Sequence, residues 1–297
     1  MILGNHRTAD VSEDETRTIR RSGNRSLWLM GLPLLLLGLL VVAAPLLPLA
    51  DPGLQDLRGR LIPPIFLEGG TWEHPLGTDQ LGRDLLARVI YGGRLTFVIA
   101  IAAVLVGSVF GTLLGMIAGY RRGWIDTIIS RVVDAQLALP FILLAIAIIV
   151  SRGRSLVVLV AVLAIISWAQ YARVIRAETL SLRERPFILG LRAAGASPIR
   201  IILRHIFPNI GGTVLVLATL EVGTMILAES ALSFLGLGVV PPDISWGGML
   251  AGGREFIQDA WWVVTFPGIA ITFVVMSINL LGDALRARYD PRKRTYL

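Results

Sequence analysis

Six long apolar stretches dominate this 297-residue sequence. A helix that crosses the roughly 30 Å hydrocarbon core of a bilayer needs about 20 mostly apolar residues, and each stretch comes close to that length. Only 16% of the residues are charged, which is too few to cover a soluble globule of this size with polar surface. We therefore predict an all-α membrane protein with six transmembrane helices. The predicted spans are residues 27–50, 95–120, 132–150, 156–171, 210–236 and 261–285.

The distribution of arginine predicts the orientation, because short loops rich in Arg and Lys stay on the cytoplasmic side. With the amino end inside, 20 of the 28 Arg and Lys residues fall in cytoplasmic segments, and both termini are cytoplasmic. The predicted organisation is a cytoplasmic tail at 1–26, a first span at 27–50, an extracytoplasmic loop at 51–94, a five-helix core at 95–285 that includes a cytoplasmic loop at 173–209, and a C-terminal tail at 286–297.

The third and fourth spans are the weakest pair. The third contains Asp134 and Pro140, and only five residues separate it from the fourth. Two of these five, Arg152 and Arg154, lie outside against the orientation rule. We predict a hairpin here and leave the ends of both spans open.

The chain lacks the residues that several kinds of chemistry need. It has no cysteine, which excludes disulfides, iron–sulfur clusters and thiolate metal sites. Its only lysine is Lys293, so a phosphate-binding loop of the G-x-x-x-x-G-K-[ST] type is impossible and any ATP that drives the protein is hydrolysed by another chain. We predict no catalytic, cofactor or metal site, and because the arginines follow the membrane topology we infer no nucleic-acid partner.

Two segments predict particular packing. In the second span, Gly107, Gly111, Gly115 and Gly119 recur every four residues, so they line one helix face and let another helix approach closely. Before that span, Thr78 or Asp79 as a cap and Gly92-Gly93 as a stop predict a separate amphipathic helix. Its polar face is either solvated or a docking surface for an extracytoplasmic partner. The members of that face are Asp79, Arg83, Asp84 and Arg88.

The cytoplasmic loop 173–209 predicts two helices joined by a sharp corner. Gly195 stops the first helix, Ser197 caps the second with Pro198 at its first position, and Pro208 ends it. A rigid unit of this kind suits docking into a groove of another protein. The alternative is a basic helix that rests on anionic lipid. Beyond the fifth span, Pro241-Pro242 and nearby glycines predict a structured turn rather than a helix.

Four acidic residues lie inside the predicted spans, where ionisable groups are costly and indicate function. Asp134 and Asp283 lie near cytoplasmic span ends, where water or the arginines Arg131 and Arg286 can partner them. Glu221 and Glu229 share one broad face of the fifth span. They either line a translocation path, with proton relay as one use, or bond to a neighbouring helix.

Four blocks of sequence resemble the permease subunits of peptide-type ABC importers, specifically the dipeptide/oligopeptide permease C family. The blocks are HPLGTDQLGRDLLARVIYGGR (74–94), SLRERPFILGLRAAGASPIRIILRHIFPN (181–209), AESALSFLGLGVVPPDISWGGML (228–250) and NLLGDALRARYDPR (279–292). The resemblance implies a type I ABC importer permease fold in a prokaryotic inner membrane. It also implies a heterodimer with a second related permease, two cytoplasmic ATPases that bind ATP and Mg, and an extracytoplasmic binding protein that delivers the solute.

The same resemblance assigns the cytoplasmic loop as the ATPase-coupling segment. Its residues are Arg192, Ala193, Ala194, Gly195, Ala196, Ser197, Pro198, Ile199, Arg200 and Pro208. The chain departs from the family pattern at Leu189, Gly190 and Leu191, where the family has Glu-Ala-Ala, so the usual acidic contact to the ATPase is missing; Glu184 is not at the matching position. A competing interpretation is a proton-coupled secondary transporter that uses Glu221 and Glu229. The resemblance does not say which peptide or other solute is carried.

Overall fold

The computed structural model describes residues 32, 36 and 38–289, and helices form almost all of its regular structure, with no β-strand in these residues. Four helices are long and apolar enough to cross a membrane, or five if one bent pair counts as a single span. The predicted all-α membrane architecture is confirmed. The tail at 1–26, most of residues 27–37 and most of the tail at 286–297 lie outside the described residues, so the number six stays a prediction. Within the predicted first span, residues 38–42 are helical, and a turn and a 3-10 helix at Ala44–Leu46 follow, so the helix does not extend to residue 50 as predicted.

The helices follow one another in a simple order. They are η1 (Ala44–Leu46), η2 (Leu57–Gly59), α2 (Leu85–Arg121), α3 (Gly123–Ala138), α4 (Phe141–Arg152), α5 (Leu156–Arg183), α6 (Pro186–Ala193), α7 (Pro198–Ile201), the π-helical η3 (Ile202–Ile206), α8 (Phe207–Phe234), α9 (Trp246–Gly253), η4 (Arg254–Phe256) and α10 (Trp262–Tyr289).

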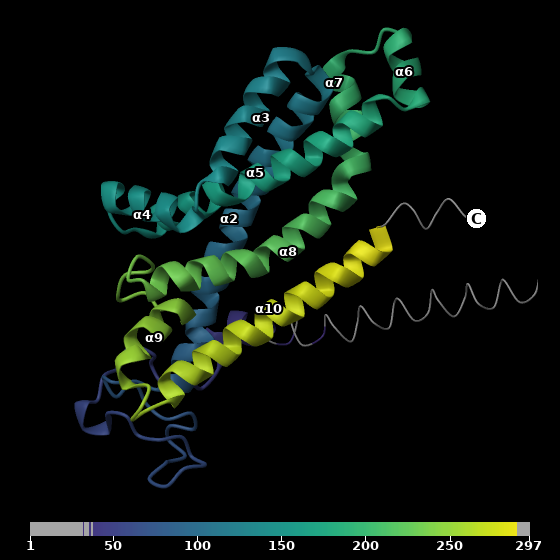
Figure 1. Cartoon of the computed structure of the whole chain (residues 1–297). Helices are drawn as coiled ribbons and strands as arrows, with labels where there is room; N and C mark the ends of the chain where they lie inside the picture. Colours follow the sequence, from purple (N-terminus) through teal and green to yellow (C-terminus); the bar gives the residue numbers. More distant parts are fainter. Residues whose placement is uncertain (1–31, 33–35, 37, 290–297) are drawn as a thin grey trace, which may run out of the picture.

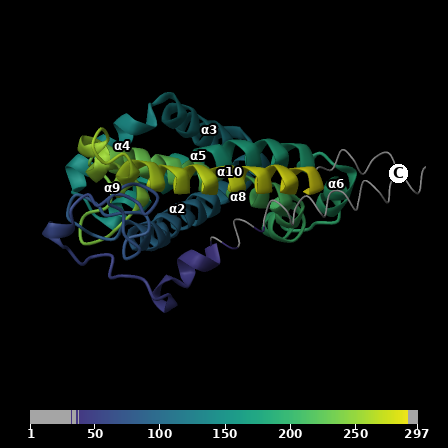
Figure 2. The same ribbon diagram turned by 90° about the horizontal axis from the view of Figure 1, so that it is seen from below.

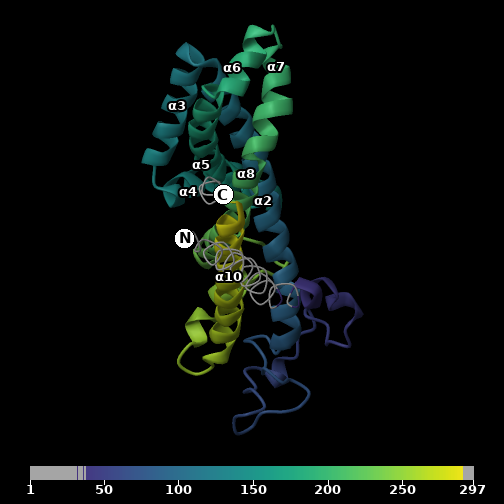
Figure 3. The same ribbon diagram turned by 90° about the vertical axis from the view of Figure 1, so that its right-hand side faces the viewer.

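The long helices form an elongated bundle whose two ends carry different segments. Residues 51–84 and α9 lie at one end, and α6 and α7 lie at the opposite end (Figures 1 and 3). Between the ends, α2 packs most extensively on α5, and α10 packs along α8 (Figure 2). Segments predicted on opposite sides of the membrane therefore lie at opposite ends of the bundle.

The separate amphipathic helix predicted before the second span is wrong. The helix begins at Leu85, where the Asp84 side chain accepts a hydrogen bond from the Ala87 backbone N–H at 2.7 Å, and it continues through Gly92-Gly93 to Arg121. A Cβ on Gly93 would lie 2.8 Å from the Trp246 ring. Gly93 makes room for the tryptophan, Gly92 lies against Ile244, and neither glycine ends the helix.

The charged face predicted on that helix is neither solvated nor open for docking. Asp79, Asp84 and Arg88 are buried. The Asp79 carboxylate pairs with Arg83 at 2.7 Å and Arg88 at 3.3 Å, and Asp84 bonds to His74 at 2.9 Å. Paired and hydrogen-bonded charges tolerate burial, so this cluster holds residues 51–84 against the start of α2.

The predicted third span, 132–150, is broken at Pro140. Leu139 adopts an extended conformation with ψ 133°, and α3 and α4 meet at an angle of 92°. Proline has no backbone N–H to donate and disfavours helical geometry in the residue before it. The pair is therefore a bent unit, and Asp134 within it pairs with Arg173 of α5 at 2.9 Å instead of with Arg131.

One predicted helix end near the cytoplasmic loop is also wrong. The helix of the fourth span, whose end was left open, continues as α5 to Arg183. Pro208 does not end the helix that starts at Pro198; the helix runs on through η3 into α8 as one span of 37 residues. In η3 the Phe207 N–H bonds to the Ile202 carbonyl five residues earlier. This wider turn accommodates the proline that follows, at the first turn of α8.

The four glycines of the second span lie against α5. A Cβ at Gly107 or Gly111 would overlap Ser167 or the Trp168 carbonyl, and at Gly115 or Gly119 it would lie 2.7 Å from a carbonyl oxygen of α5. Each glycine therefore faces backbone or side chain of α5 at a distance that no larger residue allows. This close approach of two backbones explains why α2 and α5 form the most extensive helix contact.

Candidate functional site

The corner predicted at Gly195 closes α6 with hydrogen bonds of its own. Gly195 has a φ of +78°, which favours glycine, and the Ala196 N–H bonds to the Leu191 carbonyl at 3.0 Å. The Gly195 N–H bonds to the Arg192 carbonyl at 3.0 Å. This pattern is the Schellman motif. Next, the Ser197 hydroxyl accepts from the Arg200 N–H and caps α7, with Pro198 at its first position.

Three isoleucines anchor this unit to the bundle. Ile188 of α6, Ile201 of α7 and Ile206 of η3 are buried in one cluster with Met116 and Tyr120 of α2 and with Ile175 and Leu182 of α5. Burial of apolar side chains of this size stabilises the contact by roughly 1.5–3 kcal/mol each. The helix–corner–helix unit is therefore fixed to the long helices on one side.

The other side of the unit is exposed and both apolar and basic. Ile199 is 70% exposed and Leu203 is 57% exposed, and Phe187 and Leu189 are also exposed. Four arginines of the same segment are also exposed, Arg185, Arg192, Arg200 and Arg204. An exposed apolar group with a polar rim marks an interaction surface. We call Phe187, Leu189, Ile199 and Leu203 with these arginines the corner surface.

Glu184 does not replace the acid that the family pattern has at Leu189. Its carboxylate pairs with Arg122 at 2.5 Å, between the end of α5 and the turn after α2. Leu189 itself is exposed on the corner surface. The residues of the corner surface named above are therefore apolar or basic, with no carboxylate among them.

Glu221 and Glu229 both lie within the packing of the chain, not on its surface. Glu229 accepts hydrogen bonds from Ser233 at 2.6 Å and from Ser245 at 2.9 Å. Ser245 is also the cap of α9, where its hydroxyl accepts from the Gly248 N–H at 3.1 Å. These contacts favour the alternative in which Glu229 bonds to neighbouring parts of the chain. A role of Glu221 and Glu229 in a translocation path stays a prediction.

The predicted turn is present at residues 235–245, which include Pro241-Pro242, but the residues that follow form a short helix, α9, which was not predicted. α9 begins at Trp246, whose indole N–H donates to the Val89 carbonyl of α2 at 2.7 Å. A Cβ on Gly247 would lie 2.6 Å from the Ser230 backbone of α8. Glycines that weaken a helix in isolation are retained here because tertiary packing needs them.

We expect two replacements of Glu229 to lower the free energy of unfolding by different amounts. Glu229→Ala leaves the Ser233 and Ser245 hydroxyls without their acceptor and should lower the free energy of unfolding by about 1–3 kcal/mol. Glu229→Gln keeps an acceptor oxygen and should cost less than about 1 kcal/mol. Thermal unfolding of the purified transporter measures both, and equal midpoints for the two variants would contradict the assigned contacts.

Two polar residues that were not predicted as site residues, Thr272 and Asn279, accompany Asp283. All three lie along one exposed side of α10, beside α8. No ion pair to Asp283 forms within residues 38–289, so Arg286 does not partner it as predicted. Residues spaced by seven and four lie on one face of a helix, and this spacing in the sequence could have identified the set.

Comparison with known proteins places the chain in a family. A sequence profile described as the binding-protein-dependent transport system inner membrane component matches residues 111–295. A dipeptide transport system permease protein of Alkalihalophilus pseudofirmus is 43% identical over 86% of this chain and 83% of its own length. A di/tripeptide transport system permease protein of Pseudomonas aeruginosa is 42% identical over 87% and 86%.

A third relative differs in the solute that its name gives. The glutathione transport system permease protein of Pectobacterium atrosepticum is 41% identical over 77% of this chain and 76% of its own length. The apolar helical bundle, the profile and these relatives all indicate a membrane component of a transport system. The chain belongs to the family of inner membrane components of binding-protein-dependent transport systems.

Proposed function

We propose that this chain is one permease subunit of an ATP-driven importer of short peptides. In this proposal it has six spans, cytoplasmic termini and the type I ABC importer permease fold, and it pairs with a second, related permease. Two cytoplasmic ATPases bind ATP and Mg and hydrolyse the nucleotide. An extracytoplasmic binding protein delivers the solute. The printed names of relatives that transport dipeptides and tripeptides support the solute class.

The observation that carries the proposal is the corner surface. Its apolar residues contribute little to the fold, because they are exposed while their neighbours Ile188 and Ile201 are buried. Apolar anchors with a basic rim suit docking into a groove of an ATPase. Because the family's acid is absent at Leu189, docking here depends on the apolar anchors and the arginines.

The part of the corner surface on α7 also belongs to the long helix that crosses the bundle. Residues 198–234 form one span of 37 residues, about 55 Å at 1.5 Å per residue. When the ATPases close, they displace α7, and a stiff helix transmits that displacement along α8 to Glu229 and α9 at the opposite end. The bundle then alternates between inward and outward openings as packed elements rotate, and the loaded binding protein stabilises the outward state.

Replacing Gly195 tests the proposed coupling. Gly195→Val places a β-branched residue at a φ of +78°, which costs at least about 1–2 kcal/mol and changes the direction of α6 relative to α7. We expect ATP hydrolysis to continue while uptake per ATP falls severalfold, because a redirected α7 no longer passes the movement of the ATPases to α8. Both rates are measured in proteoliposomes that contain all subunits. Gly195→Asn, which tolerates this backbone conformation, should retain most coupling; unchanged uptake per ATP in Gly195→Val would count against the role.

A further inference from the structure

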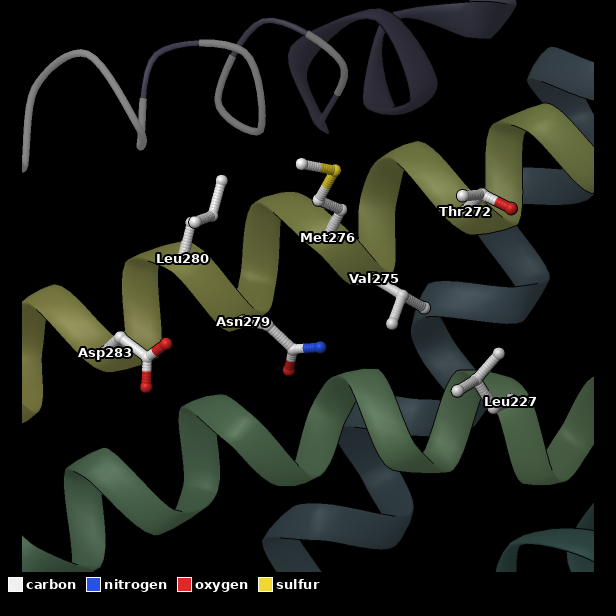
Figure 4. A pocket seen from close by; sticks show the side chains of 7 residues that line it. All are labelled: Leu227, Thr272, Val275, Met276, Asn279, Leu280 and Asp283. Carbon is white, nitrogen blue, oxygen red and sulfur yellow. The ribbon is translucent and has the colours of Figure 1, made fainter.

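A groove of about 360 Å³ runs between α8 and α10. Asn279 and Asp283 project from α10 toward α8, and Leu227 lies across from them on α8 (Figure 4). The complete lining is Leu227, Thr272, Val275, Met276, Asn279, Leu280 and Asp283. Three of these side chains are polar, although α10 is one of the membrane-crossing helices.

Lipid tails cannot form hydrogen bonds with the polar side chains of this groove. Asn279 and Asp283 are exposed, and neither forms a side-chain hydrogen bond or an ion pair within the part of the chain that the structure describes. Hydrocarbon offers no hydrogen bonds, so such groups in a span face water or polar partners. The outward face of α2 is different, since its exposed side chains Leu105, Val109 and Phe110 are apolar and suit lipid.

The chemistry of the groove selects its occupant. A carboxylate without a cation attracts a positive charge, and the Asn279 carbonyl oxygen accepts a hydrogen bond from an N–H group. Leu227, Met276 and Leu280 contribute apolar surface to the same lining. A few polar groups within an apolar lining, in a volume of this order, are typical of small-molecule sites.

We propose that the α8–α10 groove forms one wall of the solute passage, and that Asp283 and Asn279 bind the protonated amino group of the solute as it passes. This inference rests on the proposed importer function. It identifies the end of the peptide that the passage contacts. Thr272, two turns from Asn279 along the same face of α10, extends the polar row toward the end of the bundle that carries α9.

Thiol labelling tests this inference, because the chain has no cysteine of its own. An Asn279→Cys variant is assembled with all subunits in proteoliposomes and exposed on both sides to cationic or anionic methanethiosulfonate reagents. We expect the preference for the cationic reagent over the anionic one to be about tenfold larger than in Asn279→Cys/Asp283→Asn, because one unit charge about 6 Å away in water favours the first reagent and disfavours the second. Dialanine should slow the labelling, and N-acetyl-dialanine should not.

Val109→Cys on the lipid-facing side of α2, where Val109 is 59% exposed, is the matched control and should react with neither reagent. No reaction at Asn279→Cys, or a charge preference unchanged by Asp283→Asn, would overturn the inference. Equal protection by dialanine and its acetylated form would overturn the amino-group assignment. ATP-driven uptake by the unaltered transporter in the same vesicles reports separately on the proposed function.

Discussion

Ile199→Asp should abolish ATP-driven uptake while leaving the fold of this chain intact. Ile199 is 70% exposed, so a carboxylate there remains hydrated in the isolated chain. In the docked complex the same carboxylate would be buried against the ATPase without a partner. Loss of an anchor at the centre of an interface costs about 2–4 kcal/mol, which corresponds to roughly 30- to 1,000-fold weaker docking.

Co-purification of the ATPases with the permease and uptake in proteoliposomes measure this effect. Ile199→Val is the matched control, because it keeps an apolar side chain and should retain both docking and uptake. The thermal unfolding midpoint of the separated permease should be unchanged in both variants. Full uptake by Ile199→Asp would exclude the corner surface as the docking site.

Gly111→Leu should prevent α2 and α5 from packing. A Cβ at this position already overlaps the Trp168 carbonyl and lies 2.7 Å from the Tyr171 Cβ, so a leucine forces the two helices apart. Because both contact atoms belong to or adjoin the α5 backbone, they cannot rotate away. We expect the free energy of unfolding to fall by about 3 kcal/mol or more, together with a large loss of folded protein from membranes.

The matched control for this change is Gly211→Ala in α8. Gly211 is also a helical glycine, but no atom lies within 4 Å of its Cβ position. Alanine there should be neutral or slightly stabilising, since it raises helix propensity. The yield of folded protein and its thermal unfolding midpoint are compared for both variants. Equal behaviour of the two variants would show that α2 and α5 do not depend on this close contact.

Local patterns predicted some of the structure well. Apolar runs place the long helices because a span needs about 20 apolar residues whatever its neighbours. The corner at Gly195 is local too: the Schellman bonds of α6 and the Ser197 cap of α7 involve residues at most five apart. Gly107 to Gly119 predict a close helix contact, but the sequence does not say that the partner is α5.

Contacts between distant residues explain the wrong predictions. Thr78, Asp79 and Asp84 are all suitable caps, yet Thr78 bonds instead to the Gly59 carbonyl, and Asp79 is held by Arg83 and Arg88. Asp84 alone remains to start α2. Helix continuation past Gly92-Gly93 depends in the same way on Trp246, which lies more than 150 residues later.

The helix through Pro208 and the polar row of α10 were missed for different reasons. Proline normally ends a helix, and only the local π-helical turn at Ile202–Ile206 shows how this one continues. Asn279 and Thr272 are uncharged, so a search for ionisable groups in spans does not find them. Their shared face with Asp283 becomes visible once α8 and α10 lie side by side (Figure 4).

Uptake against a gradient by defined subunit sets tests the central claim most directly. Vesicles with this chain, its permease partner, the ATPases and the loaded binding protein should accumulate dipeptide when ATP is supplied. Vesicles with this chain alone should accumulate none, with ATP or with a proton gradient. Proton-driven accumulation by the chain alone would contradict the account and favour a secondary transporter that uses Glu221 and Glu229.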